Sequence, residues 1–104
     1  MSGIVVVLST AGSQDEASRI ASALVERRLA ACVSVVPGVL STYRWEGAVQ
    51  TAPEWLLVVK TKADRFEDVR VAIRELHSYE LPEIVMIEAG RIDAGYAAWI
   101  DANT

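Results

Sequence analysis

Cysteine is nearly absent from this sequence, because Cys32 is the only one among its 104 residues. A single cysteine cannot form a disulfide within the chain, so packing must hold the fold together, which suits a reducing compartment. Long apolar runs are also missing: the longest, Ile4 to Leu8, is far shorter than the ~20 residues that span a bilayer. No basic segment precedes it, as a secretory signal would require. We therefore expect a cytoplasmic protein without a membrane partner.

Basic residues are fewer than acidic ones, with 10 Lys and Arg against 14 Asp and Glu, which gives a net charge of −4. Binding to phosphate backbones depends on Lys and Arg, so nucleic acid is not an expected partner. Closely spaced metal motifs, such as C-x-x-C or H-E-x-x-H, are absent as well. A transition-metal site would therefore need ligands from a second chain.

Apolar residues make up 52% of the chain, and there are only three prolines and six glycines. This composition is typical of a globular protein, and the length predicts one domain over residues 1–104. Residues 3–11 are β-branched and lack a polar face, which predicts a strand covered on both sides. Ser13 to Glu16 reads as a capping box, in which hydroxyl and carboxylate each bind a free backbone N–H. A helix is predicted from there to about Arg28.

The apolar period changes from 3.6 towards 2 at about residue 30, which predicts a second strand. Pro37-Gly38 interrupts this strand, the alternation resumes as far as Trp45, and Glu46-Gly47 supplies a turn. The return strand is predicted to run from Val49 to Thr61, with Pro53 marking either an irregularity or an exposed edge. Together these segments predict one long β-hairpin.

A second helix is predicted after the hairpin, capped by Thr61 or Asp64 and closed by His77. A fourth strand follows over residues 83–90. A short last helix begins at Asp93 and carries its large apolar side chains on one face, namely Tyr96, Trp99 and Ile100. The order β-α-β-β-α-β predicts an α+β fold of the ferredoxin-like, split βαβ type, with both main helices on one face of an antiparallel sheet.

Two features of this fold predict self-association. The hairpin is longer than so small a sheet needs, and two helices cover only one sheet face. The uncovered face and the projecting hairpin would then pair with other copies of the chain, so we expect a homo-oligomer.

Cys32 and His77 are the first candidates for chemistry. Cys32, among small apolar residues, has three interpretations: a packed side chain, a soft metal ligand, or a nucleophile that His77 would have to activate. His77 either stabilises the helix C-terminus or belongs to a site in the loop HSYELPE, together with Glu80 and Glu83.

The aromatic residues of the hairpin and one lysine are further candidates. Tyr43, Trp45 and Trp55 either pack, within one chain or between subunits, or form a stacking surface for a ligand. Lys60, directly after an apolar strand, either anchors an anionic group or lies in solvent at a strand end.

Nearly the whole chain resembles the CutA family, the divalent-cation tolerance proteins. The matching stretches are STAGSQDEASRIASALVERRLAACVSVVPGV, STYRWEG, EWLLVVKT and HSYELPEI, in that order. The resemblance implies a tight homotrimer with a small cleft at each subunit interface, and a link to copper and other divalent cations. The family usually has proline after the histidine, where this chain has Ser78, so the loop is expected to be less rigid. The family's recurring residues fall on Cys32, Tyr43, Trp45, Gly47, Glu54, Lys60, Thr61, His77, Tyr79, Glu80, Pro82 and Glu83.

The resemblance leads to two functional hypotheses. The first is a non-enzymatic trimer that binds copper or another divalent cation through Cys32, His77 and Glu83. The second is a sensor trimer similar to the nitrogen regulator PII, which would hold a small anionic ligand beside Lys60. In both, the cleft between subunits would be lined by Tyr43, Trp45, Lys60, Tyr79 and Glu80. An acylphosphatase of this fold would need an arginine after the first strand, and LSTAGSQ has none, so we do not expect an enzyme.

Overall fold

Residues 3–104 are described by a computed structural model, in which four strands form one antiparallel sheet. The strands are β1 (Ile4–Ala11), β2 (Cys32–Trp45), β3 (Ala48–Lys62) and β4 (Val85–Glu88), and they lie in the order β2-β3-β1-β4. With helices α1 (Gln14–Glu26) and α2 (Phe66–Leu76), the chain follows the predicted β-α-β-β-α-β order. β4 is shorter than the predicted strand, because only its four residues pair with β1.

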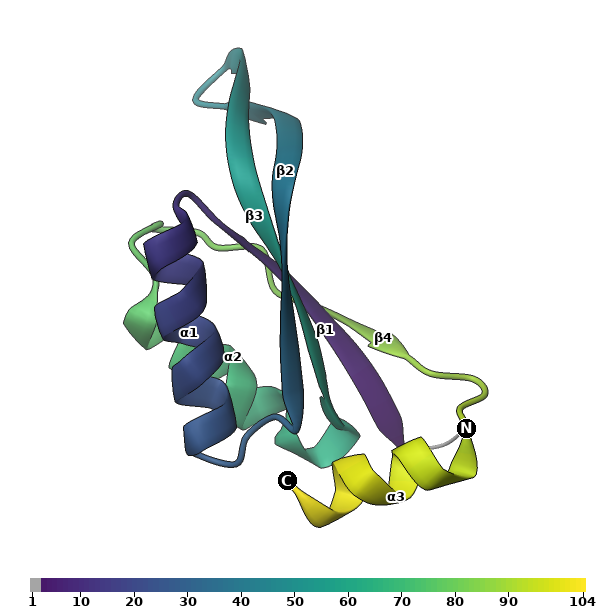
Figure 1. The fold of residues 1–104 in the computed structure, drawn as a ribbon. Helices are drawn as coiled ribbons and strands as arrows, with labels where there is room; N and C mark the ends of the chain where they lie inside the picture. Colours follow the sequence, from purple (N-terminus) through teal and green to yellow (C-terminus); the bar gives the residue numbers. More distant parts are fainter. Residues whose placement is uncertain (1–2) are drawn as a thin grey trace.

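Helices α1 and α2 lie side by side on one face of the sheet, as predicted (Figure 1). Their apolar stripes meet the side chains that the strands direct to that face. Full burial of each such aliphatic side chain contributes about 1.5–3 kcal/mol. The residues of this core that are at most 1% exposed include Val5, Val7, Ile20, Leu24, Leu57, Val59, Val69 and Ile73.

The capping box at α1 is only half confirmed. The Ser13 hydroxyl accepts a hydrogen bond from the backbone N–H of Glu16 at 3.1 Å, as expected of an N-cap residue. The Glu16 carboxylate does not return to the backbone of Ser13. It accepts a hydrogen bond from the backbone N–H of Ser78 instead, so it links α1 to the loop after α2.

The predicted capping of α2 by Thr61 or Asp64 is wrong. A short 3₁₀ turn (Ala63–Arg65) intervenes, and neither it nor α2 has a side-chain cap. The buried Thr61 hydroxyl instead donates to the carbonyl of Leu29 at 2.6 Å and fixes the entry to β2. The predicted end of the helix is confirmed, because His77 is the C-cap residue of α2.

The last helix, α3 (Ala94–Ala102), lies across one end of the sheet (Figure 1). Asp93 caps it as predicted, with Oδ2 accepting from the backbone N–H of Tyr96 at 3.0 Å. Only Ile100 is buried, whereas Tyr96 and Trp99 stack on each other and remain 40% and 45% exposed, so the predicted common apolar face does not pack as a unit. Across residues 3–104, no helix is long and apolar enough to cross a membrane.

The hairpin of β2 and β3 projects beyond the body of the sheet (Figure 1). A register shift between Val36 and Val39 confirms the predicted bulge at Pro37-Gly38, where Gly38 has a φ of +79°. The tight turn has positive φ at Glu46 and Gly47, as a type I′ hairpin requires. Pro53 pairs with Leu40 without a register shift. It lies beyond the end of β1, so it marks an exposed edge rather than an irregularity.

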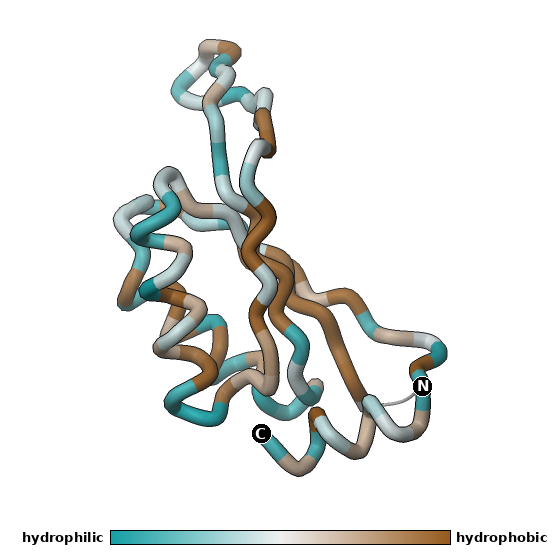
Figure 2. Tube along the Cα trace, in the orientation of Figure 1, coloured by the Kyte–Doolittle hydropathy of each residue, from teal (hydrophilic) through white to brown (hydrophobic). Residues whose placement is uncertain are grey.

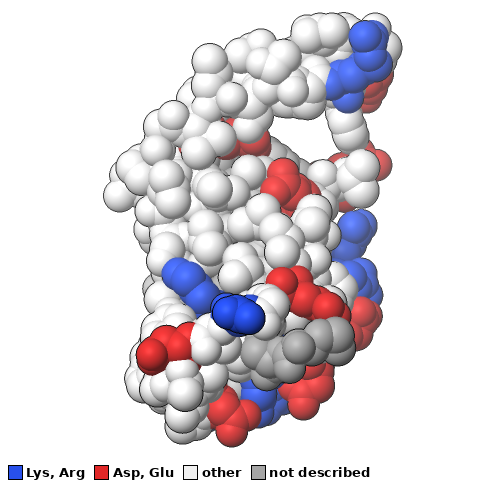
Figure 3. Space-filling view, turned by 90° about the vertical axis from the view of Figure 1, so that its right-hand side faces the viewer, with Lys and Arg blue, Asp and Glu red and all other residues white. Residues whose placement is uncertain are grey.

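The sheet face opposite α1 and α2 is open over most of its area. Apolar side chains gather on it, and Figure 3, which looks onto this side, shows a broad uncharged surface with most charges towards its margins. The hydropathy of the trace is also highest in the strands of the body, while the hairpin tip is more polar (Figure 2). We call the following residues the open face: Val6, Leu8, Val36, Leu56, Val58, Val85 and Ile87.

Candidate functional site

The loop after α2 is held in place by His77, whose side chain is fully buried. Its Nε2 lies 2.6 Å from the carbonyl oxygen of Thr10, and its Nδ1 lies 3.0 Å from the backbone nitrogen of Tyr79. A carbonyl can only accept, so Nε2 carries the proton, and Nδ1 accepts from the N–H of Tyr79. Both ring nitrogens are therefore engaged in joining the end of β1 to the loop.

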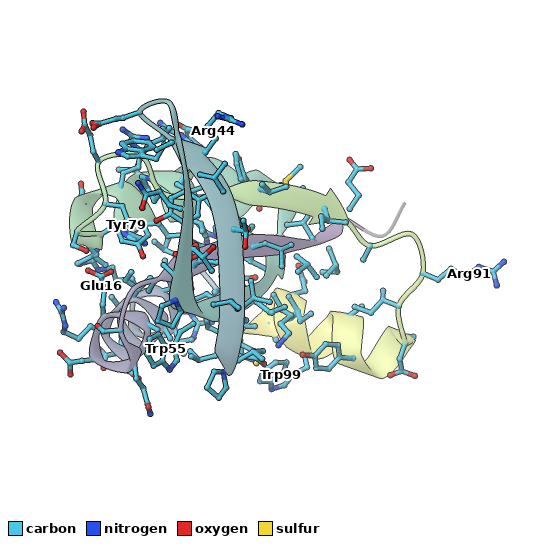
Figure 4. All side chains as sticks on the ribbon, turned by 90° about the horizontal axis from the view of Figure 1, so that it is seen from above. Glu16, Arg44, Trp55, Tyr79, Arg91 and Trp99 are labelled. Atoms are coloured by element: carbon cyan, nitrogen blue, oxygen red, sulfur yellow. The ribbon has the colours of Figure 1, made fainter. Side chains whose placement is uncertain are left out.

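Glu16, in the first turn of α1, also contacts the loop after α2. Its Oε2 accepts from the backbone N–H of Ser78 at 3.1 Å, while Oε1 lies 3.7 Å from Nδ1 of His77 and has no hydrogen-bond partner. The residue is 6% exposed. Figure 4 shows Glu16 close to Tyr79 at one end of the molecule. The first turn of α1 and the imidazole together position the loop that follows.

Tyr79 crosses from this loop to the hairpin. Its hydroxyl donates to Oε2 of Glu54 at 2.9 Å, and Glu54 is only 7% exposed. Burial, together with the hydrogen bond and the charge of Glu54, raises the pKa of Tyr79 to about 12, so the phenol remains a neutral donor. A Cβ at Gly12 would lie 2.9 Å from the Tyr79 hydroxyl, so any larger residue there would have to displace the phenol.

A hollow of about 760 Å³ lies between the loop and the hairpin. Figure 3 shows an opening beneath the hairpin tip, with acidic side chains beside it. Three aromatic rings and three carboxylates contribute to the walls, and none of the described lining residues is Lys or Arg. The residues that line the hollow are Thr10, Ser41, Thr42, Tyr43, Trp45, Glu54, Tyr79, Glu80, Leu81, Pro82 and Glu83.

The sequence matches the family described as CutA1 divalent ion tolerance protein over residues 5–103. The divalent-cation tolerance protein CutA of Thermus thermophilus is 46% identical over 99 residues, which are 95% of this chain and 96% of that protein. The chain belongs to the CutA1 family. The CutA protein of Archaeoglobus fulgidus is 41% identical over 88% of this chain and 89% of its own length.

Solved structures of family members share the fold. The divalent cation tolerance protein of Thermus thermophilus has a TM-score of 0.95 at 44% identity, covering 97% of this chain and 98% of that one. The crystal structure of CutA from Xylella fastidiosa also has a TM-score of 0.95, at 35% identity and 97% coverage of both chains. The family is named for tolerance of divalent ions rather than for a reaction.

Most of the predicted cleft residues are brought together in this CutA1 chain. Tyr43, Trp45, Tyr79 and Glu80 line one hollow, and Glu83, predicted as a metal ligand, lines it too. Glu54 was recognised only as a recurring family residue and had no predicted role. The contribution of Gly12 and Glu16 was not predicted at all, because it depends on contacts across 62 or more residues of sequence.

Lys60 and Cys32 lie elsewhere. Lys60 Nζ donates to the Ser34 hydroxyl at 2.5 Å and lies 3.6 Å from Cys32 Sγ, on the same face of adjacent strands. Cys32 also adjoins α3, where burial and this thiol raise the pKa of Tyr96 above its usual value. The predicted place of Lys60 in the same hollow as Tyr79 is therefore not seen within the single chain.

Cys32 and His77 are separated along the sheet. Cys32 is in register with Lys60 and Val6, whereas His77 contacts Thr10, four residues further along β1. Four strand residues span roughly 13 Å, so the imidazole of one chain cannot activate its own thiol. Within residues 3–104, no three Cys, His, Asp or Glu side chains are grouped so as to hold a metal ion. The described residues of one chain therefore do not form a metal site by themselves.

Proposed function

We propose that the chain is a non-enzymatic, cytoplasmic homotrimer that binds copper or another divalent cation, with ligands contributed by more than one subunit. The predicted ligands remain Cys32, His77 and Glu83. Glu83 is exposed at the hollow and free of hydrogen bonds within the described chain, so it is the most accessible of the three. Cys32 lies in contact with Lys60, and His77 would have to release Tyr79 in order to coordinate a metal.

The observation that supports the proposed binding of a cation is the negative charge of the residues that line the hollow. Glu54, Glu80 and Glu83 border it without a lining Lys or Arg among the described residues. Carboxylates attract cations and, among metals, suit divalent ions with oxygen ligands. The alternative of a small anionic ligand has no support, because Lys60 is not among the residues that line the hollow.

The observation that supports a trimer is the open face. Val36, Val85 and Ile87 are 42–49% exposed in the single chain, alongside other half-buried apolar residues. A contiguous apolar patch of this kind is typical of an interface between subunits. The residues most exposed on the hairpin, such as Leu40 at 70%, would extend the contact along its length.

Copper titration of the intact oligomer tests the proposal. We expect saturable Cu²⁺ binding to the wild type and weaker binding to Cys32→Ala, His77→Ala and Glu83→Gln. Glu75→Gln, which removes one carboxylate from the exposed surface of α2, is the matched control and should bind as the wild type does. Identical isotherms for all five proteins would remove these residues from the site, and a mass equal to one chain by light scattering would refute the trimer.

A further inference from the structure

The hollow has features that a metal site does not explain. Its volume of about 760 Å³ is within the range of pockets for organic ligands and far larger than the cage of oxygen atoms that surrounds a metal ion. Tyr43, Trp45 and Tyr79 line it alongside the apolar Leu81 and Pro82. Aromatic rings and aliphatic side chains do not coordinate divalent cations, so this part of the lining is suited to the apolar portion of an organic ligand.

A buried carboxylate, that of Glu54, favours a ligand with a positive charge. Glu54 lines the hollow and is 7% exposed, and its Oε2 accepts from the Tyr79 hydroxyl. Its other oxygen, Oε1, has no hydrogen bond within residues 3–104 and is not among the fully enclosed polar atoms. Oε1 can therefore be reached from the hollow and is free to accept a hydrogen bond from a donor bound there.

No positive side chain of the described lining supplies that donor. Arg44 alternates with Tyr43 and Trp45 along β2, so it projects to the other side of the strand, and Figure 4 shows it on the side of the hairpin away from Tyr79. Glu80 and Glu83 add two further carboxylates at the loop side. The potential inside the hollow is therefore negative, and aromatic faces attract cations as well.

We propose that the hollow binds a small organic cation, a primary ammonium on an apolar or aromatic body, with Glu54 Oε1 accepting from the ammonium and Trp45 and Tyr43 packing on the body. One free carboxylate oxygen suits an ammonium better than a guanidinium, because a guanidinium binds best to both oxygens of a carboxylate. Tyr79 holds the other oxygen and keeps the carboxylate oriented. This inference concerns a ligand class and does not depend on the binding of a divalent metal.

The test uses the intact oligomer, treated with a chelator, and two probes of the same shape. Benzylamine carries an ammonium on an aromatic ring, and benzyl alcohol is its uncharged counterpart. By isothermal titration we expect saturable binding of benzylamine at one site per chain, and binding of benzyl alcohol at least tenfold weaker. Glu54→Gln keeps an acceptor for Tyr79 but removes the charge, and should weaken benzylamine binding at least tenfold. Glu75→Gln should leave it unchanged within twofold.

Tryptophan fluorescence provides an independent readout if Glu54→Gln fails to fold. Of the three tryptophans only Trp45 lines the hollow, so benzylamine should change the emission of the wild type and of Trp99→Phe but not of Trp45→Phe. Any of three results overturns the proposal: no saturable binding of benzylamine by the wild type, equal affinity for the two probes, or unchanged affinity in a folded Glu54→Gln protein. The first result would also be found if a second copy of the chain fills the hollow.

Discussion

The two faces of the sheet carry similar apolar side chains but differ in how the chain covers them. On the helix face, Leu57 and Val59 are fully buried beneath α1 and α2. Their neighbours Leu56 and Val58 point to the open face and are only half-buried. The segment is apolar on both sides, as in a strand buried on both faces. The difference shows that residues 3–104 cover only one of two apolar sheet faces, which is the basis for the proposed association.

The sheet face opposite α1 and α2 has two unlike parts. At one end, the polar residues Thr10 and Glu54 are each 7% exposed, although Val36 on the same face is 42% exposed. The loop that carries Tyr79 covers the polar end, while the apolar middle lacks any such cover from the described chain. The carboxylate of Glu54 is thus ordered by contacts within the single chain, whereas the apolar part has the exposure expected of the proposed interface.

The largest expected effect comes from the helix face. Leu57→Ala removes a side chain that is fully buried, and we expect the free energy of unfolding to fall by about 2–5 kcal/mol. Leu56→Ala makes the same change on the open face, and its cost should grow with protein concentration if other subunits cover Leu56. Urea denaturation at several concentrations measures both. Equal losses that do not depend on concentration would contradict the distinction between the faces.

The second prediction compares two valines of almost equal exposure, Val36 at 42% on the open face and Val71 at 41% on α2. Val36→Asp would place an unpaired carboxylate in the proposed interface, at a cost of several kcal/mol. Since 1.4 kcal/mol corresponds to a tenfold change, we expect dissociation at protein concentrations at least 100-fold higher than for the wild type. Val71→Asp should leave the mass unchanged on light scattering. The same dilution behaviour for both variants would argue against association through the open face.

The elements of the fold could be predicted from local patterns, because periodicity, turns and caps depend on residues close in sequence. The turn at Glu46-Gly47 and the Asp93 cap are examples. The predicted cap of α2 was wrong for a physical reason: Thr61 lies within β3, where the carbonyl of Leu29, 32 residues away, binds its hydroxyl and competes with the capping position. No local pattern contains that competitor.

The candidate site was only partly predictable. Tyr43, Trp45 and Glu80 were singled out from the sequence, and the family resemblance assigned them to a cleft, but the role of Glu54 depends on Tyr79, which is 25 residues away. Glu16 was read as part of a capping box because its spacing from Ser13 fits one, yet its carboxylate binds the loop 62 residues later. Side chains that have a local and a distant partner available cannot be assigned from spacing alone.

A third, smaller effect is expected at the polar end of the sheet face opposite α1 and α2. In Gly12→Ala the new Cβ would lie 2.9 Å from the Tyr79 hydroxyl and should displace it from Glu54. Loss of one hydrogen bond to a charged group predicts a decrease of about 1.5–3 kcal/mol in the free energy of unfolding, partly offset where water replaces Tyr79. Gly90→Ala is the matched control, since its Cβ would meet nothing within 4 Å. If Gly12→Ala and Tyr79→Phe lower stability independently, so that the double variant shows the sum, the two residues are not coupled as described.

The smallest effect is a pH dependence that belongs to the polar end alone. Tyr79 has a folded pKa of about 12 against an ordinary value of 10.0, so between these values the folded chain holds a proton that the unfolded chain has lost. The folded state then binds more protons, and the free energy of unfolding must fall as pH rises through this window. Denaturation at pH 9.5 to 12 should give a shallower decline for Tyr79→Phe than for the wild type. The two proteins differ only in the phenol, so the difference between the two slopes isolates its contribution. Gly12→Ala should also give a shallower decline of stability with pH, because a tyrosine displaced from Glu54 loses both the burial and the negative neighbour that raise its pKa. Parallel declines for all three proteins would contradict the burial of Tyr79 against Glu54.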